Sequence, residues 1–458
     1  MLIIHCNNSF RPEREYIYDC VFHDFWQIDY KIKYEKRNDV ELEYNGVSLY
    51  IADTFLQMDE RSWLRQESLP LQPLVVLNVP LMYEECVTDT KLPVIYGDSA
   101  DALFLDDEKK CSVDIFGSAL FMLTRYEEIV KKERDELDRF PARASLACQE
   151  GFEERPIINE YLEIIWKWMT KYFSGIERRK RVYTIMPTHD VDVPFWGMYV
   201  DNWHKFRLLC GDVLKRREWS TIKKHICYIY DGLRKKYESD PFNTFDMVMD
   251  TSEKNGVKSN FYFMTAQGKS NMDGNYDLSE PKIKRLIKNI VERGHNIGIH
   301  FSFNSYDNQL YVNEESDKIR DFISKKNIPQ ESFGGRYHWL RWKTPDSWKY
   351  NEMAGIDYDS TMGFVECLGF RCGICYDYPV YNVMEHKKYK LREYPLIVMD
   401  GSGLADYGLK LSKEEMLAKC NELKKKVKKF NGVFVILWHN SFFTEDGYAE
   451  LYKEIVSR

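Results

Sequence analysis

Three short segments of the chain carry carboxylates or imidazoles that could bind a cation. Asp190 and Asp192 are separated by one residue, so they could hold one cation together or divide into a metal ligand and a general base. The other two segments contain His300 and His439. Each signal is modest by itself, because loops are rich in Asp and a lone His is often a core residue.

Each of these residues lies at or just beyond the end of a short apolar run that is typical of a β-strand. Five such runs follow residue 181, at 182–186, 259–264, 296–300, 392–399 and 433–438. Segments with an apolar repeat of three to four residues lie between them, and helices are predicted at 283–293 and 413–430. This alternation predicts a parallel sheet, open or closed into a barrel. Since the carboxyl ends of parallel strands meet at one edge, the two Asp and two His residues should converge there.

The N-terminal part of the chain has a different pattern, which predicts a smaller mixed α/β domain. A buried strand is expected at 75–80, and helices with apolar stripes at 114–128 and 158–173. The basic stretch 177–181 is typical of a solvated linker. We therefore expect two domains, an accessory domain at residues 1–180 and a larger one at residues 181–458.

Composition narrows the classes of protein to consider. The 458 residues are 44% hydrophobic, which suffices for sizeable cores and excludes a mainly disordered chain. A net charge of −7 argues against a dedicated nucleic-acid binder. No apolar run approaches the roughly 20 residues that cross a bilayer, so we expect no transmembrane segment.

Cysteine usage and the first residues bear on the compartment. The 11 cysteines are an odd number scattered along the chain, which favours reduced thiols over a disulfide framework. Residues 1–6 show no basic segment followed by a long apolar stretch, so we expect no secretory signal and a cytoplasmic location. Cys372 and Cys375 form a single CxxC, and a zinc knuckle would need a second pair of ligands.

The order of the motifs resembles that of the polysaccharide deacetylases, the NodB-homology domain of carbohydrate esterase family four. The resemblance covers roughly residues 181–458. It rests on Thr-x-Asp-x-Asp at 188–192, Gly-His-x-Ile-Gly-x-His at 294–300, an Arg-rich segment at 334–342 and Leu-x-His at 437–439. It implies an α/β fold, a distorted (β/α) barrel of about seven strands, preceded by the N-terminal domain that a bacterial subgroup of the family carries.

The resemblance also implies a set of roles. In that family a divalent metal, usually zinc, is held by one Asp and two His, and water attacks the carbonyl of an N-acetyl group on a sugar. Carried over to this chain, Asp190 is the general base, while Asp192 and His300 are metal ligands. His439 protonates the departing amine, and Arg336 orients the base and lowers its pKa.

Two departures from the family pattern affect these roles. The carboxylates of the family are adjacent, whereas here one residue intervenes, so Asp190 and Asp192 could exchange roles. The position of the third metal ligand is Asn304, whose amide oxygen is a poorer zinc ligand than imidazole. His338 or Asp307 could complete the ligand set instead.

These expectations together predict a metal-dependent hydrolase that removes N-acetyl groups from amino sugars of a polysaccharide or its precursor. The side chains expected to contact the N-acetylated saccharide are Tyr337, His338, Trp339 and Arg371. Because Asn304 weakens the expected metal site, the alternative is a weakened or inactive barrel that serves as a carbohydrate-binding or scaffolding module. Hydrolysis of a linear amide outside sugars is a third possibility.

Overall fold

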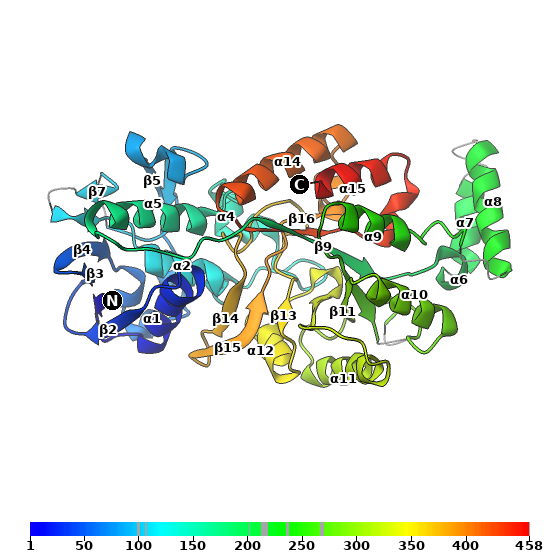
Figure 1. Ribbon diagram of the computed structural model, residues 1–458, viewed down its shortest axis with the longest axis horizontal. Coiled ribbons are helices and arrows are strands. Elements are labelled where there is room, and N and C mark those ends of the chain that lie inside the picture. Colours follow the sequence, from blue (N-terminus) through cyan, green and yellow to red (C-terminus); the bar gives the residue numbers. More distant parts are fainter. Residues whose placement is uncertain are drawn as a thin grey trace.

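A nine-stranded sheet forms the centre of the protein (Figure 1). The computed structural model describes residues 1–98, 101–105, 108–200, 202–211, 219–234, 238–265 and 270–457. The strand order is β14-β15-β13-β12-β11-β10-β9-β17-β16. The strands are β9 (Thr184–Val191), β10 (Asn260–Met264), β11 (Asn296–Phe301), β12 (Gly334–Tyr337), β13 (Tyr358–Asp359), β14 (Tyr378–Asn382), β15 (Lys387–Glu393), β16 (Val398–Met399) and β17 (Val433–Leu437).

Neighbouring strands of this sheet run parallel, except that β14 and β15 form an antiparallel pair. The α/β class is therefore confirmed. A barrel of about seven strands is not confirmed, because the sheet has nine strands and, within the described residues, β14 and β16 end it without pairing. The predicted run at 392–399 is two strands, β15 and β16, separated by a segment that contains Pro395.

Helices follow most of the strands. They are α6 (Trp196–Tyr199), α7 (Asn202–Gly211), α8 (Trp219–Leu233), α9 (Phe245–Lys254), α10 (Pro281–Glu292), α11 (Gln309–Lys325), α12 (Asp346–Met353), α13 (Asp400–Leu404), α14 (Lys413–Lys429) and α15 (Tyr448–Val456). The apolar repeat of α10 is buried as predicted, and α14 begins with a capping box formed by Ser412 and Glu415. Figure 1 shows α7 and α8 projecting from the rest of the molecule.

The N-terminal part contains a six-stranded sheet with the order β2-β1-β3-β4-β8-β7 and a separate hairpin, β5-β6. Its strands are β1 (Leu2–Cys6), β2 (Tyr30–Tyr34), β3 (Asp39–Tyr44), β4 (Val47–Ala52), β5 (Val75–Asn78), β6 (Lys91–Val94), β7 (Phe104–Leu105) and β8 (Lys110–Cys111). Its helices are α1 (Arg11–Tyr18), α2 (Ile115–Leu123), α3 (Tyr126–Val130), α4 (Leu146–Gln149) and α5 (Ile157–Tyr172).

Two predictions for the N-terminal part are wrong in detail. The strand expected to be buried at 75–80 is β5, in which Val75 and Val76 are exposed because a two-stranded hairpin has little to cover it. The helix expected at 114–128 is broken at Arg125, whose φ of 51° is left-handed, so α2 and α3 are separate. All residues of α2 are buried, so this helix has no exposed polar face opposite an apolar stripe.

The two expected domains share one hydrophobic core cluster. Polar contacts also join them, including the ion pair between Glu128 and Arg371 and the hydrogen bond from Tyr16 to the carbonyl oxygen of Pro379. The boundary between residues 180 and 181 stays a prediction. None of the helices in the described ranges combines the length and the apolar character needed to cross a bilayer.

Candidate active site

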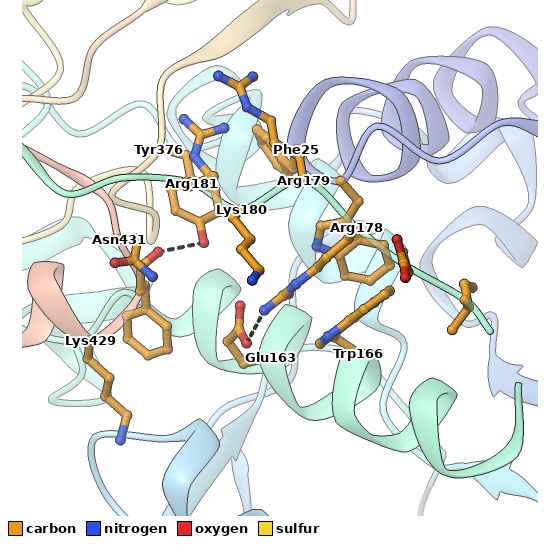
Figure 2. Close-up of a pocket in the computed structure, with 14 residues that line it drawn as sticks. Phe25, Glu163, Trp166, Arg178, Arg179, Lys180, Arg181, Tyr376, Lys429 and Asn431 are labelled. Atoms are coloured by element: carbon orange, nitrogen blue, oxygen red, sulfur yellow. Dashed lines mark hydrogen bonds and ion pairs between the residues drawn. The ribbon is translucent and has the colours of Figure 1, made fainter. Parts of the chain in front are cut away.

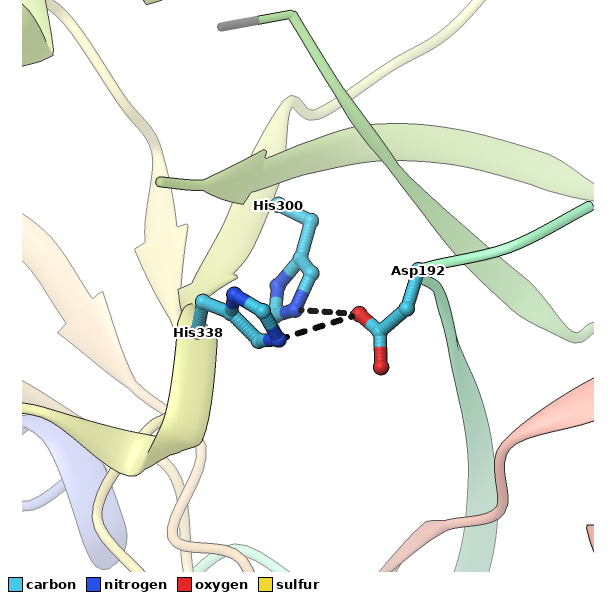
Figure 3. Close-up of side chains that lie close together, drawn as sticks. All are labelled: Asp192, His300 and His338. Atoms are coloured by element: carbon cyan, nitrogen blue, oxygen red, sulfur yellow. Dashed lines mark ion pairs between the residues drawn. The ribbon is translucent and has the colours of Figure 1, made fainter. Parts of the chain in front are cut away.

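Asp192, His300 and His338 converge at the carboxyl edge of the central sheet (Figure 3). Asp192 follows β9, His300 lies near the end of β11, and His338 follows β12. The Oδ1 atom of Asp192 lies 3.1 Å from Nε2 of His300 and 3.6 Å from Nε2 of His338. All the ligand atoms of this cluster lie within 4.8 Å of one another. Three strands of one parallel sheet thus deliver one carboxylate and two imidazoles to a single point.

Two atoms of this cluster are buried without a hydrogen-bond partner. They are Oδ1 of Asp192 and Nε2 of His300, which approach each other but are not aligned for a hydrogen bond. A buried polar atom without a partner is costly, and native proteins rarely tolerate one unless an ion or ligand satisfies it. One carboxylate oxygen and two imidazole nitrogens form the donor set of a catalytic zinc site. The cluster therefore fits a divalent cation of this kind.

The rings of both histidines are oriented by groups behind them. Nδ1 of His300 donates to the carbonyl oxygen of Arg336 at 2.9 Å, so that in the neutral ring the lone pair of Nε2 faces Asp192. Nδ1 of His338 lies 2.9 Å from Oδ1 of Asp273, a carboxylate that also accepts a hydrogen bond from the backbone N–H of Phe303. A carboxylate behind a histidine ligand fixes its ring and raises its basicity.

Asp190 lies beside the cluster and is held by Arg336. Nη1 of Arg336 donates to Oδ1 of Asp190 and to the hydroxyl oxygen of Thr188, both at 2.9 Å. Oδ2 of Asp190 lies 3.7 Å from Nε2 of His300. Arg336 is fully buried and donates also to Ser360, so its guanidinium is immobile. One oxygen of Asp190 is thereby anchored and the other faces the cluster.

His439 faces the other oxygen of Asp192. Its Nε2 lies 3.8 Å from Oδ2 of Asp192, and its Nδ1 lies 2.8 Å from Oδ1 of Asp400. Asp400, the first residue of α13, also accepts the backbone N–H of His439. Burial alone would lower the pKa of His439, but the Asp400 carboxylate outweighs it and raises the pKa to about 10. His439 thus carries a proton at neutral pH.

The charges of the cluster shift two further groups. Burial would raise the pKa of Asp192, but His338 and His300 outweigh it and hold that pKa well below its usual range. Burial would lower the pKa of His300, and the carboxylates of Asp190 and Asp192 raise it instead. Positive charge facing Asp192 thus stabilises its ionised carboxylate, and a bound cation would also supply such charge.

Of the three candidates for the third ligand, His338 is the one that lies with Asp192 and His300. Asn304 and Asp307 are exposed in the loop that follows β11. The hydroxyls of Ser302 and Ser305 in this loop donate to Glu315 of α11 at 2.6 and 2.7 Å. These bonds hold the loop after β11 against α11. The third candidate ligand is instead His338, which follows the neighbouring strand β12.

The side chains expected to contact a saccharide differ in their exposure. Tyr337 is fully buried, and its hydroxyl donates to Asn351. Alternate residues of β12 point to opposite faces of the sheet, so Tyr337 points away from the face on which Arg336 meets Asp190. Arg371 is also buried, where it pairs with Glu128. Neither has a surface to offer a sugar, which corrects both assignments. Trp339 is 40% exposed and follows His338 directly.

Sequence reasoning missed Asp273 and Asp400. Asp273 lies in a loop outside any strand end, and no motif marks it. Asp400 follows β16 directly, so the rule that polar residues at carboxyl ends of strands form the site could have found it.

A cavity of about 620 Å³ lies away from this edge, where the two parts of the chain meet (Figure 2). It is lined by the basic stretch 177–181, by α5 and by the end of α14, and none of the site residues borders it. Arg178 pairs with Glu163 at 2.6 Å and Arg181 pairs with Asp377 at 2.7 Å. The linker expected to be solvated is therefore partly packed and ion-paired, although Arg179 and Lys180 are exposed.

Comparisons with known proteins gave one family model and a similar solved structure. Residues 2–174 match the model of a family of unknown function, DUF7033. Among curated proteins, none matches the chain. A solved structure of a candidate polysaccharide deacetylase from Mycobacterium smegmatis is similar at 14% identity, covering 61% of this chain and 84% of that chain, with a TM-score of 0.39. A TM-score of this size does not establish a common fold.

Proposed function

We propose that the protein is a metal-dependent hydrolase that removes N-acetyl groups from amino sugars. The observation that carries this proposal is the cluster of Asp192, His300 and His338, in which two buried atoms face each other without a hydrogen bond. A general base candidate, Asp190, and a protonated imidazole, His439, lie against the same cluster. Hydrolysis of an amide at neutral pH needs these parts, an activated water, a base and a proton donor for the amine.

The roles of the two carboxylates follow from their partners. Asp192 has an oxygen 3.1 Å from His300 and lacks a hydrogen bond there, which suits a metal ligand. Asp190 gives one oxygen to Arg336 and keeps the other free, which suits a base that must accept a proton. A divalent cation such as zinc, when bound to Asp192, His300 and His338, supplies a Lewis acid and lowers the pKa of water.

The remaining steps belong to the side chains of this chain. Oδ2 of Asp190 accepts the proton of the attacking water, while Arg336 holds the carboxylate in place. Nε2 of His439 donates its proton to the nitrogen of the leaving amine, and Asp400 keeps that ring oriented and charged. The new C–O bond forms as the carbonyl electron pair moves to oxygen, and when that pair returns the C–N bond breaks and the nitrogen leaves with the proton from His439. The products are acetate and the free amino sugar.

The saccharide part of the proposal rests on Trp339. This indole is 40% exposed beside His338 and offers an apolar plane to a sugar ring. His338 supplies the imidazole that Asn304 cannot, which supports an intact metal centre over the alternative of a binding or scaffolding module. The particular sugar and a cytoplasmic location stay predictions.

The decisive experiment pairs metal analysis with acetate release from N-acetylated amino-sugar oligosaccharides. We expect one equivalent of divalent metal in the wild type. Asp190→Asn should keep the metal and lose about 10²- to 10⁴-fold in kcat, the usual contribution of a general base. Glu43→Gln, a carboxylate change outside the site, is the matched control and should leave both unchanged. Equal acetate release by Asp190→Asn and the wild type would contradict the role of Asp190, whereas no acetate release by either protein would contradict the hydrolase and favour the binding module.

A further inference from the structure

The turn that carries His338 has a strained backbone. Trp339 has φ 60° and ψ 15°, and Leu340 has φ 52°, so two bulky residues in succession adopt the left-handed region. A residue other than glycine in this region is strained and persists only where its surroundings hold it. Both lie in the 3-10 helix η9 (His338–Leu340), directly after β12. Contacts made to this turn therefore decide where the third ligand and the exposed indole lie.

The first contact comes from the N-terminal part of the chain. Nη1 of Arg139 donates to the carbonyl oxygen of Trp339 at 3.0 Å. Arg139 is itself held, because its Nε donates to Asp135 at 2.7 Å and Asp135 also accepts the backbone N–H groups of Leu137 and Arg139. The loop 135–139 is thus a closed hydrogen-bonded unit that presents one guanidinium N–H to the strained turn.

The second contact fixes the far end of the same turn. Nε of Arg341 donates to the carbonyl oxygen of Leu137 at 2.7 Å, and its Nη1 donates to the carbonyl oxygen of Phe303 at 2.6 Å. The guanidinium carbon lies 4.0 Å from the ring centre of Phe303 and 3.9 Å from that of Tyr306. Tyr306 in turn donates to Asp138. Arg341 therefore ties the end of the turn to the loop 135–139 and to the loop after β11.

We propose that the loop 135–139 is a clamp that positions His338 for metal binding and Trp339 for the saccharide. This inference rests on the proposed function and extends it, because it gives the N-terminal part a role in the site. Asp273 orients the ring of His338 from one side, and the clamp sets the backbone that carries it from the other. Arg139 is a positioning residue, since it touches neither metal ligand atoms nor substrate.

A matched control is available at another contact between the same two parts. Nζ of Lys419 on α14 pairs with Glu154 at 2.8 Å, with 28% of each side chain exposed. Lys419→Ala removes one interaction between the two parts that does not involve the turn. If the role of Arg139 is only structural, Arg139→Ala and Lys419→Ala should differ from each other in thermal stability alone.

The test uses the full chain with Arg139→Ala, Arg139→Lys and Lys419→Ala. The readouts are zinc affinity, the absorption spectrum of the Co²⁺-loaded protein, KM against kcat, and thermal stability. Arg139→Ala should weaken zinc binding by about 10- to 100-fold, the usual effect of losing support behind a ligand, and should change the Co²⁺ spectrum and raise KM. Arg139→Lys, which keeps a donor and a positive charge, should lie closer to the wild type. Lys419→Ala should bind zinc as the wild type does.

Wild-type zinc affinity, Co²⁺ spectrum and KM in Arg139→Ala would overturn the inference while leaving the proposed function intact. A wild-type protein that binds neither metal would overturn both. If Arg139→Ala does not fold, Asp135→Asn replaces it, because it should shift the Co²⁺ spectrum if the clamp sets His338 and should leave the spectrum unchanged if it does not.

Discussion

Two clusters of the protein combine imidazoles with carboxylates but differ in how their polar atoms are paired. One is the cluster of Asp192, His300 and His338, and the other, on the N-terminal sheet, contains His5, Glu35 and Glu41. Nδ1 of His5 lies 2.9 Å from Glu35 and its Nε2 lies 2.8 Å from a further carboxylate, Glu43. The cluster on the N-terminal sheet therefore leaves no ring nitrogen of its histidine for a cation.

The difference is that a cationic side chain of the protein already pairs with the carboxylates of the cluster on the N-terminal sheet. The guanidinium of Arg37 pairs with Glu35 at 2.8 Å and with Glu41 at 2.7 Å, so these carboxylates are already neutralised. No arginine or lysine pairs with Asp192 among the described residues, and two atoms of its cluster lack partners. Residue types and proximity are alike in the two clusters. Unsatisfied buried atoms, which an ion would satisfy, distinguish the cluster of Asp192 from the ion-pair network around His5.

The largest expected effect is on metal binding when Asp192 changes. Asp192→Asn removes the only carboxylate charge of the proposed ligand set, so zinc affinity should fall by more than the roughly 100-fold that follows loss of a supporting group. Equilibrium dialysis with zinc measures it. Glu41→Gln is the control in the other cluster and should bind zinc as the wild type does. Equal zinc binding by both variants would remove the distinction drawn between the clusters.

A smaller effect is expected at Asp273, which contacts no metal. Asp273→Asn weakens the hydrogen bond that orients His338, so zinc affinity should fall by about 10- to 100-fold with the fold retained. Competition with a chelator of known affinity measures the change, and circular dichroism checks the fold. An unchanged affinity would show that the His338 ring is fixed without Asp273.

The smallest effect is on the pH dependence of stability through the cluster on the N-terminal sheet. Burial would raise the pKa of Glu41, but hydrogen bonds from Ser48 and Arg37 outweigh it and lower the pKa from 4.5. Because the pKa is lower in the folded state, this stabilisation is complete above the unfolded value and is lost as pH falls through the folded one. Since this ion pair lies near the surface, with 18% of the Glu41 side chain exposed, the loss should stay at about 1 kcal/mol or less.

Urea unfolding between pH 6 and pH 3 of the wild type and of Glu41→Gln measures this contribution. The variant should show a shallower loss of stability on acidification, and Glu60→Gln, an exposed carboxylate outside the cluster, should follow the wild type. Identical pH profiles of Glu41→Gln and the wild type would mean that Arg37 does not favour the charged form of Glu41.

Strand periodicity predicts much of the edge at which the candidate site lies. The apolar runs at 182–186, 296–300 and 433–438 correspond to β9, β11 and β17, although β9 begins two residues later and extends to Val191. Asp190, Asp192, His300 and His439 converge because the carboxyl ends of parallel strands lie at one edge. Short strands such as β13 carry too few residues for a periodic signal, so the sequence pattern predicts five runs where the sheet has nine strands.

The groups that complete the site depended on contacts distant in sequence. His338 was one of three candidates, and the choice follows from Ser302 and Ser305 binding Glu315, which holds Asn304 in an exposed loop. The inward direction of Arg336 leaves Tyr337 in the core, a consequence of register. Neither the order of motifs nor composition contains this information.

The sequence by itself indicated the class of chemistry that we propose and the edge at which the candidate residues lie, because alternating strands and helices place the carboxyl ends of parallel strands together. Only the tertiary structure decided which imidazole joins Asp192 and His300, and which of two similar clusters keeps atoms unsatisfied. The physical reason is that a loop's direction and a carboxylate's counter-ion are set by neighbours far along the chain, such as Glu315 and Arg37, and short-range patterns do not record them.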